Sequence, residues 1–140
     1  MSGIQMSEEA IKAYDELRLK HNANAIIFVI NPEQTAVIVE QIFAGEQPAE
    51  EVIKAVVDVL PEKDCRFIVY DFKFESDGCN MSKLAFIQWS PEAAKTRPKM
   101  LYSSTKRACI DKMSGIQLEI QANSLDEFNK DYMLEKCRRK

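Results

Sequence analysis

The sequence predicts a single α/β (α+β) domain over residues 1–140, in which helices cover both faces of a central, mixed, five-stranded sheet. Three observations support this class. With 46% apolar and 29% charged residues, the 140-residue chain has the ordinary composition of one globular domain. Helix-like and strand-like patterns alternate along it, and turns join several of the strands. A chain of this length buries roughly two thirds of its unfolded surface, so it can form a core without disulfides or metals.

The first half of the chain predicts a helix, a strand pair and a second helix. Residues 7–20 place apolar side chains at three-to-four spacing, with acids in the first turn and cations in the last, as in a helix. The runs 25–30 and 35–43 are rich in β-branched residues and lie on either side of a turn, which predicts paired strands. A proline at each end of 48–61, with one apolar stripe between them, indicates the second helix.

The middle of the chain predicts a projecting hairpin. Residues 65–74 and 83–89 have the composition of strands, and the polar stretch 75–82 that joins them contains Asp77 and Gly78, a pair that favours a tight turn.

Three elements are expected in the last third. Pro98 begins a helix that runs to about Met113, and Gly115 ends it. Residues 115–121 alternate like a half-buried strand. Ser124 has the features of a helix start, so we expect a last helix from there to about Cys137.

The formal net charge of −3 hides an uneven distribution. Residues 1–94 carry eight basic and sixteen acidic side chains, a net charge of −8, whereas residues 95–140 carry eleven and six, a net charge of +5. A dedicated nucleic-acid binder would be strongly basic, so this class is excluded. We expect any anionic partner to meet the last third of the chain.

The residues that most enzymes and metal sites need are not arranged for chemistry. No C-x-x-C pair is present, His21 is the one histidine, and the four glycines lie too far apart for a phosphate loop, so no catalytic residue, metal or cofactor is expected. The chain lacks a signal-peptide pattern and an apolar run long enough to span a membrane. We therefore expect a cytoplasmic protein with reduced thiols. Its cysteines are Cys65, Cys79, Cys109 and Cys137.

The helix that begins at Pro98 has an unusual outer face. At about 100° per residue, the side chains near Thr105 point inward; these are Leu101, Tyr102, Ala108, Cys109 and Met113. The outward side chains are Lys99, Met100, Ser103, Lys106, Arg107 and Ile110, and Lys95 and Arg97 extend the positive charge upstream. A solvent-exposed face would be polar throughout, whereas Met100 and Ile110 lie here among cations. Apolar side chains within a charged rim favour a protein-binding helix over a plain solvent face.

At these residues the chain resembles the actin-depolymerising factor (ADF)/cofilin family. The resemblance covers nearly the whole chain, and its specificity lies in the order and spacing of several short motifs rather than in any one of them. The motifs are Met1–Ile4, Leu60–Phe67, Trp89–Glu92, Arg97–Lys106, Gly115–Ile116 and Gln121–Asn123.

The resemblance implies the ADF-homology (gelsolin-like) fold and a non-enzymatic protein of the actin cytoskeleton. Such a protein acts as a monomer, binds monomeric actin (G-actin) and filamentous actin (F-actin), prefers ADP-loaded subunits, and severs and depolymerises filaments. The implied G-actin contacts are Ser2, Gly3, Ile4, Arg97, Lys99, Met100, Ser103, Thr105 and Lys106, and Arg107 joins them as a further cation. Met100 and Ile4 would enter an apolar cleft on actin, and Ser2 would be the regulatory phosphorylation site.

A second, filament-specific surface is implied in the hairpin and the last helix, at Met81, Lys83, Glu135, Lys136 and Arg139. Met81 stands where the family often has a cation, so the strength of severing stays open. Two alternatives remain. One is a filament side-binder that does not cut, and the other is an adaptor that responds to phosphoinositides through Lys95, Arg97, Lys99, Lys106 and Lys112.

Overall fold

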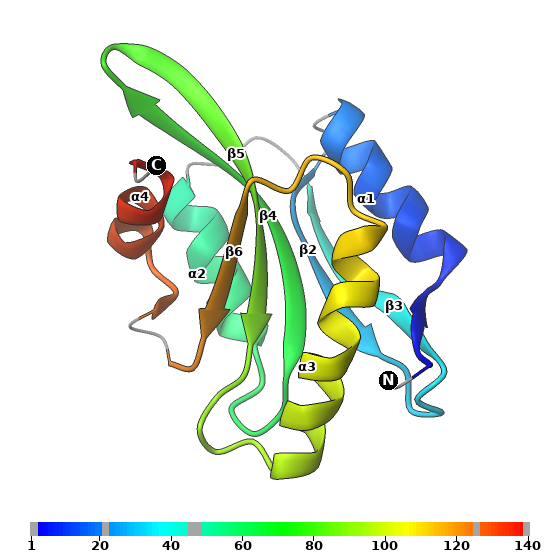
Figure 1. The fold of residues 1–140 in the computed structure, drawn as a ribbon. Coiled ribbons are helices and arrows are strands. Elements are labelled where there is room, and N and C mark those ends of the chain that lie inside the picture. Colours follow the sequence, from blue (N-terminus) through cyan, green and yellow to red (C-terminus); the bar gives the residue numbers. More distant parts are fainter. Residues whose placement is uncertain (1–2, 21–22, 45–48, 125–126, 139–140) are drawn as a thin grey trace.

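The computed structural model describes residues 3–20, 23–44, 49–124 and 127–138. Within them, strands form one mixed sheet in the order β1-β3-β2-β4-β5-β6 (Figure 1). The strands are β1 (Gln5–Met6), β2 (Ala23–Ile30), β3 (Ala36–Ala44), β4 (Arg66–Ser76), β5 (Cys79–Trp89) and β6 (Leu118–Ala122). The helices are α1 (Glu8–Lys20), α2 (Ala49–Val59), α3 (Thr96–Asp111) and α4 (Lys130–Arg138).

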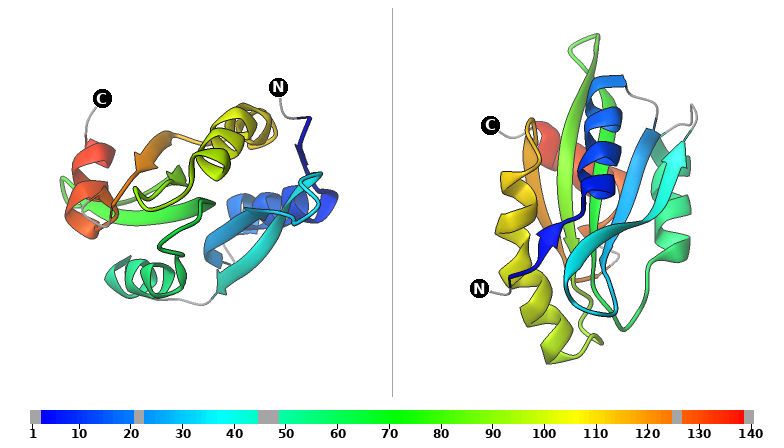
Figure 2. Two further views of the ribbon diagram at one scale, coloured as in Figure 1. Left: turned by 90° about the horizontal axis from the view of Figure 1, so that it is seen from below. Right: turned by 90° about the vertical axis from the view of Figure 1, so that its right-hand side faces the viewer.

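The predicted fold class is confirmed, although the sheet has six strands and not five. The additional strand, β1, pairs in parallel with β3 through Gln5↔Ala36 and Met6↔Val37. Two residues are too few to show the alternation by which a strand is identified in a sequence. This short strand holds the N-terminal segment beside α3 (Figure 2).

Two apolar cores lie on opposite faces of the sheet. One core packs α1 and α3 against the sheet, through residues such as Tyr14, Phe67 and Cys109. The other packs α2 and α4 against the opposite face, for example through Val56 and Met133. The molecule therefore has three layers, with α1 and α3 on one side of the sheet and α2 and α4 on the other (Figures 1 and 2).

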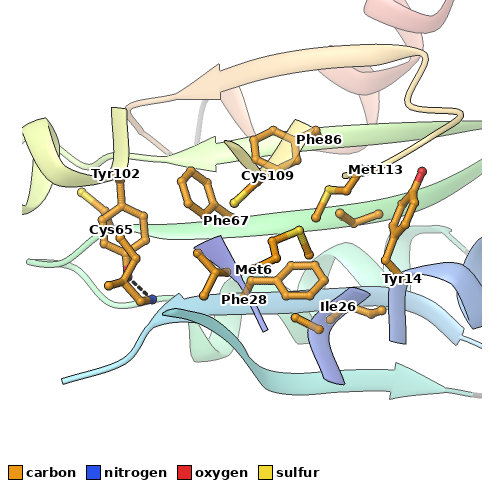
Figure 3. Packing of buried hydrophobic residues seen from close by; sticks show 14 of the residues in the cluster. Met6, Tyr14, Ile26, Phe28, Cys65, Phe67, Phe86, Tyr102, Cys109 and Met113 are labelled. Carbon is orange, nitrogen blue, oxygen red and sulfur yellow. Dashed lines mark hydrogen bonds between the residues drawn. The ribbon is translucent and has the colours of Figure 1, made fainter. Parts of the chain in front are cut away.

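Tyr102 fastens α3 to the first of these cores (Figure 3). Its ring is 4% exposed and its centroid lies 5.0 Å from that of Phe67. Its hydroxyl oxygen accepts a hydrogen bond of 3.0 Å from the backbone N–H of Ile30, at the end of β2. The hydrogen bond satisfies a buried donor and fixes the position of the first half of α3.

The hairpin projects further and is more regular than the sequence predicts. Strands β4 and β5 pair without interruption from Arg66↔Trp89 to Ser76↔Cys79, so most of the expected loop 75–82 is strand. The turn is Asp77-Gly78, and φ is 52° and 78° at these residues, as a type I′ turn requires. Since this ribbon extends beyond the helices, its exposed strands contain many polar residues and look like a loop in the sequence (Figure 1).

The last helix, α4, begins later than its predicted start at Ser124. The carboxylate of Glu127 accepts a hydrogen bond of 3.1 Å from the backbone N–H of Asn123, so the expected capping residues form a local turn instead. Asn129 is the residue that caps the helix, since its Oδ1 accepts a hydrogen bond of 2.9 Å from the backbone N–H of Tyr132.

The buried core predicts a loss of stability at alkaline pH. Burial raises the pKa of Tyr14 from 10.0 to about 12 and that of the Cys109 thiol from 9.0 to about 12. The unfolded chain releases these protons at the lower values, so the associated stability is complete below pH 9 and falls as the pH rises toward about 12. We expect Cys109→Ala to make this fall shallower. Urea unfolding at a series of pH values measures how the free energy of unfolding depends on pH. If this free energy falls as steeply with pH in Cys109→Ala as in the wild type, the assignment to Cys109 is contradicted.

Candidate functional site

Helix α3 runs along the outside of the molecule beside the N-terminal segment (Figure 2). Its inward residues include Tyr102, Thr105 and Cys109, as the helical wheel predicts. Thr105 is fully buried, and its hydroxyl donates a 2.7 Å hydrogen bond to the backbone oxygen of Leu101. Thr105 therefore lies inside the molecule, as the wheel predicts, and not on the surface that the resemblance implies.

One ridge of α3, which we call the tethered ridge, consists of Lys99, Ser103, Lys106 and Ile110. The first three contact β5, β6 or the loop after β5. The contacts are Lys99 Nζ to Glu92 O (3.1 Å), Gln88 Nε2 to Ser103 Oγ (3.0 Å) and Lys106 Nζ to Glu119 Oε1 (3.5 Å). Ile110 is half-buried against the core, which corrects its predicted outward position. The wheel gives the angle of a residue about the axis and cannot show that this flank faces the sheet.

A second ridge, which we call the free ridge, consists of Met100, Ser104, Arg107 and Asp111, and all four side chains are exposed. Met100 is 66% exposed, with Arg97 and Lys99 close to it in the sequence. A large apolar side chain among cations favours a protein-binding surface over a plain solvent face.

A groove of about 460 Å³ separates the free ridge from the N-terminal segment. Among the described residues that line it, Ala108 is apolar, Arg107 and Lys112 carry positive charge, and Asp111 carries negative charge. The groove joins the two chain segments that we predict to bind G-actin into one concave surface. Its lining residues are Gly3, Ile4, Gln5, Ser104, Arg107, Ala108, Asp111 and Lys112.

The structure changes what the N-terminal residues can do. Ile4 is 2% exposed and belongs to the core beneath α1 and α3, so its side chain is not the exposed apolar anchor that we expected. Ile4 and Gly3 nevertheless line the groove. Ser2 lies outside the described residues. Direct contacts from this segment stay a prediction.

The five cations of the expected phosphoinositide site do not gather at one point. Lys95 precedes the first turn of α3 and Lys112 follows the last, so the length of a 16-residue helix, about 24 Å, separates them. Arg97 contacts Gln34 on the β2–β3 turn at 3.4 Å, and Lys106 is paired with Glu119. The set forms an extended positive stripe rather than a pocket for one headgroup.

The second predicted surface lies on the hairpin and α4. Met81 is 45% exposed and pairs across the ribbon with Phe74, while Lys83 pairs with Phe72. Helix α4 packs on the same face of the sheet as Phe72.

On α4, Glu135 is exposed and Lys136 Nζ lies 5.3 Å from the ring centre of Tyr132. Arg139 lies outside the described residues. The exposed part of the hairpin combines apolar side chains with balanced charges, since Lys73 and Lys83 oppose Glu75 and Asp77.

Sequence reasoning missed the residues that tether α3, which are Gln88, Glu92 and Glu119. A signal existed only for Gln88, which is a polar residue inside the apolar run of β5. In the described part of the chain, no group of three or more His, Cys, Asp and Glu side chains could hold a metal ion. None of the described helices is long and apolar enough to cross a membrane.

Comparison with known proteins identifies the relatives of this chain. A sequence model of the cofilin/tropomyosin-type actin-binding protein family matches residues 3–138. Actophorin of Acanthamoeba castellanii is 36% identical over 99% of this chain and 98% of its own length. Cofilin of Schizosaccharomyces pombe is 34% identical over 99% of this chain and 98% of its own length.

Solved structures agree with these relationships. The crystal structure of Streptomyces griseoflavus cofilin has a TM-score of 0.88 at 31% identity and covers 98% of both chains. The crystal structure of Plasmodium berghei actin depolymerization factor 2 has a TM-score of 0.90 at 24% identity, which is a likeness of fold.

Proposed function

The chain belongs to the ADF/cofilin family of actin-binding proteins, and from this premise we propose that residues 1–140 form one ADF-homology domain that binds actin monomers and filaments and disassembles the filaments. The observation that carries the proposal is the exposure of Met100, at 66%, on the free ridge of α3 among cations. Family membership also implies association with the actin cytoskeleton in the cytoplasm.

The proposed contact with one actin subunit consists of the free ridge, the groove beside it, and the accessible side chains of Lys99, Ser103 and Lys106 on the tethered ridge. Met100 fills an apolar cleft on actin, while Arg97, Lys99 and Arg107 face acidic side chains and orient the encounter. A phosphate on Ser2, the residue that precedes Gly3 in the sequence, would add a charge of about −1.5 to −2 and would oppose docking through desolvation and repulsion.

Disassembly needs no catalytic group. A protein that binds ADP-loaded subunits in one filament conformation more tightly than in another shifts the filament toward the favoured conformation. The hairpin and α4 supply the second contact, which only a filament can occupy together with the first. Binding energy that differs between filament states then weakens contacts between subunits and promotes severing.

Met81→Arg tests the contribution of the hairpin to severing. An added cation at this 45% exposed position gives the hairpin a net positive charge toward an acidic filament, so we expect more cuts per filament length and time. Single-filament fluorescence microscopy measures this severing rate. Met81→Gln, which removes the apolar group without adding charge, is the control; equal severing by both variants would contradict a role for charge.

A phosphoinositide-responsive adaptor is the second candidate, favoured by the positive stripe along α3. Lipid binding through this stripe depends on charge, so it should weaken steeply with salt and be unchanged in Met100→Ala. Binding to vesicles that contain phosphatidylinositol bisphosphate measures this property independently of actin.

Co-sedimentation with filamentous actin, together with titration of labelled monomeric actin, tests the leading proposal. We expect saturable binding to both forms, tighter for ADP-loaded than for ATP-loaded subunits. A protein that stays in the supernatant and does not perturb the labelled monomer would contradict it.

A further inference from the structure

We propose, on the basis of the function proposed above, that Gln88 of β5 positions the Ser103 hydroxyl as a hydrogen-bond donor to a carboxylate on actin. Gln88 does not itself reach the surface. It acts by holding one exposed side chain of α3 in the orientation that a partner can use.

The position of Gln88 is unusual for its chemistry. It is 2% exposed in a strand whose neighbouring residues, Phe86 and Ile87, are fully buried and apolar. The alternation along β5 places Gln88 on the same face as Phe86, which is the face that α3 covers. A buried amide requires a partner, and its Nε2 donates to Ser103 Oγ at 3.0 Å.

This hydrogen bond determines the direction of the serine proton. Because the Gln88 amide donates into Ser103 Oγ, the serine oxygen acts as the acceptor and its own O–H has to point elsewhere. Within the described residues, Gln88 is the only hydrogen-bond partner of the Ser103 hydroxyl. Its hydroxyl proton is therefore available to an acceptor outside the protein.

The neighbouring hydroxyl groups show what Ser103 would do without Gln88. Ser104 Oγ and Thr105 Oγ1 both donate to the backbone oxygen of Leu101, at 3.0 and 2.7 Å. Serine and threonine in helices commonly bond in this way to the preceding turn. An apolar residue at position 88 would leave the Ser103 hydroxyl free to donate to the preceding turn, which contains Lys99. The O–H would then no longer be available to a partner protein.

The surroundings of Ser103 select the acceptor. Lys99 and Lys106 lie four residues before and three residues after it on the tethered ridge. Lys106 is paired with Glu119, but Lys99 Nζ donates to the neutral backbone oxygen of Glu92 and therefore keeps its positive charge uncompensated there. This charge attracts an anionic oxygen, and a hydrogen bond to a charged acceptor is stronger than one to a neutral acceptor. A carboxylate is the protein group with this chemistry.

A double-mutant cycle tests the inference. The affinity for monomeric ADP-actin is measured for the wild type, Gln88→Met, Ser103→Ala and the double variant, and each protein's unfolding midpoint is measured in parallel. We expect each single substitution to weaken binding by about 3- to 10-fold, and the double variant to bind no more weakly than Ser103→Ala alone. Ser114→Ala, an exposed serine beyond the end of α3, is the control and should bind like the wild type.

The outcomes separate the two proposals. Wild-type affinity in Gln88→Met, or additive losses in the double variant, would overturn the positioning role. If Gln88→Met does not fold, Gln88→Leu replaces it in the cycle, and Ser103→Ala at wild-type affinity is by itself sufficient to overturn the inference. A wild-type protein that does not bind actin would instead overturn the proposed function.

Discussion

Replacing Met100 with alanine is expected to weaken binding to monomeric actin by about 10- to 100-fold. Met100 is 66% exposed in the free protein, so its truncation leaves the packing of this chain intact. In the complex, the same side chain would be surrounded by actin and by the cations of α3. Removal of a large apolar group from such a position lowers the binding affinity most. Titration of labelled actin monomers measures the change in affinity, and the unfolding midpoint should stay within error of the wild type.

Leu19→Ala is the matched control for this experiment. Leu19 is also 66% exposed, but it lies in the last turn of α1, outside both proposed surfaces. If exposed apolar area alone mattered, both variants would lose affinity to a similar degree. Equal losses, or an unchanged affinity in Met100→Ala, would contradict the assignment of the free ridge as the actin contact.

Replacing Tyr102 with alanine is expected to lower the free energy of unfolding by about 3 to 5 kcal/mol. The ring fills space between α3 and Phe67, and its hydroxyl satisfies the backbone N–H of Ile30 at 3.0 Å. Removing both creates a cavity and leaves a buried donor without a partner. Equilibrium unfolding in urea measures the change, since a shift of the midpoint at constant slope reports stability alone.

Tyr102→Phe separates the two contributions. The ring remains and only the hydroxyl is lost, so the expected cost is about 1 to 3 kcal/mol, the cost of an unsatisfied buried donor. If Tyr102→Phe were as stable as the wild type, the hydrogen bond to Ile30 would not contribute, and the attachment of α3 would depend on packing alone.

The elements with strong internal patterns could be predicted from the sequence. The buried stripe of α3 at Tyr102, Thr105 and Cys109 follows from spacing, even for the polar Thr105, whose hydroxyl bonds within the helix. The sheet class follows from the alternation of strands and helices. These features depend on residues close together in the chain, and their periodicity is visible without a structure.

Features that depend on distant partners could not be predicted. Strand β1 exists because Gln5 and Met6 meet Ala36 and Val37, and its two residues carry no pattern. The hairpin is exposed over much of its length, so its polar composition does not indicate strand. In these cases, pairing across the sheet decides the structure and local propensity contributes little.

The candidate site shows the same division. The sequence identified the cations and Met100 on the outer side of α3, but not that one ridge is tethered to β5 and β6 while the other is free. Likewise, Ile4 could be recognised as an apolar residue near the N-terminus, whereas its burial depends on packing against the sheet and α3. A helical wheel describes one helix and contains no information on its neighbours.

Time-lapse imaging of single, labelled actin filaments in the presence of the purified protein tests the central claim most directly. We predict that the wild-type protein binds along aged, ADP-rich filaments and shortens them by cutting and by loss of subunits, and that Met100→Ala does so only at much higher concentration. Filaments whose length and number stay the same at saturating wild-type protein would contradict the claim.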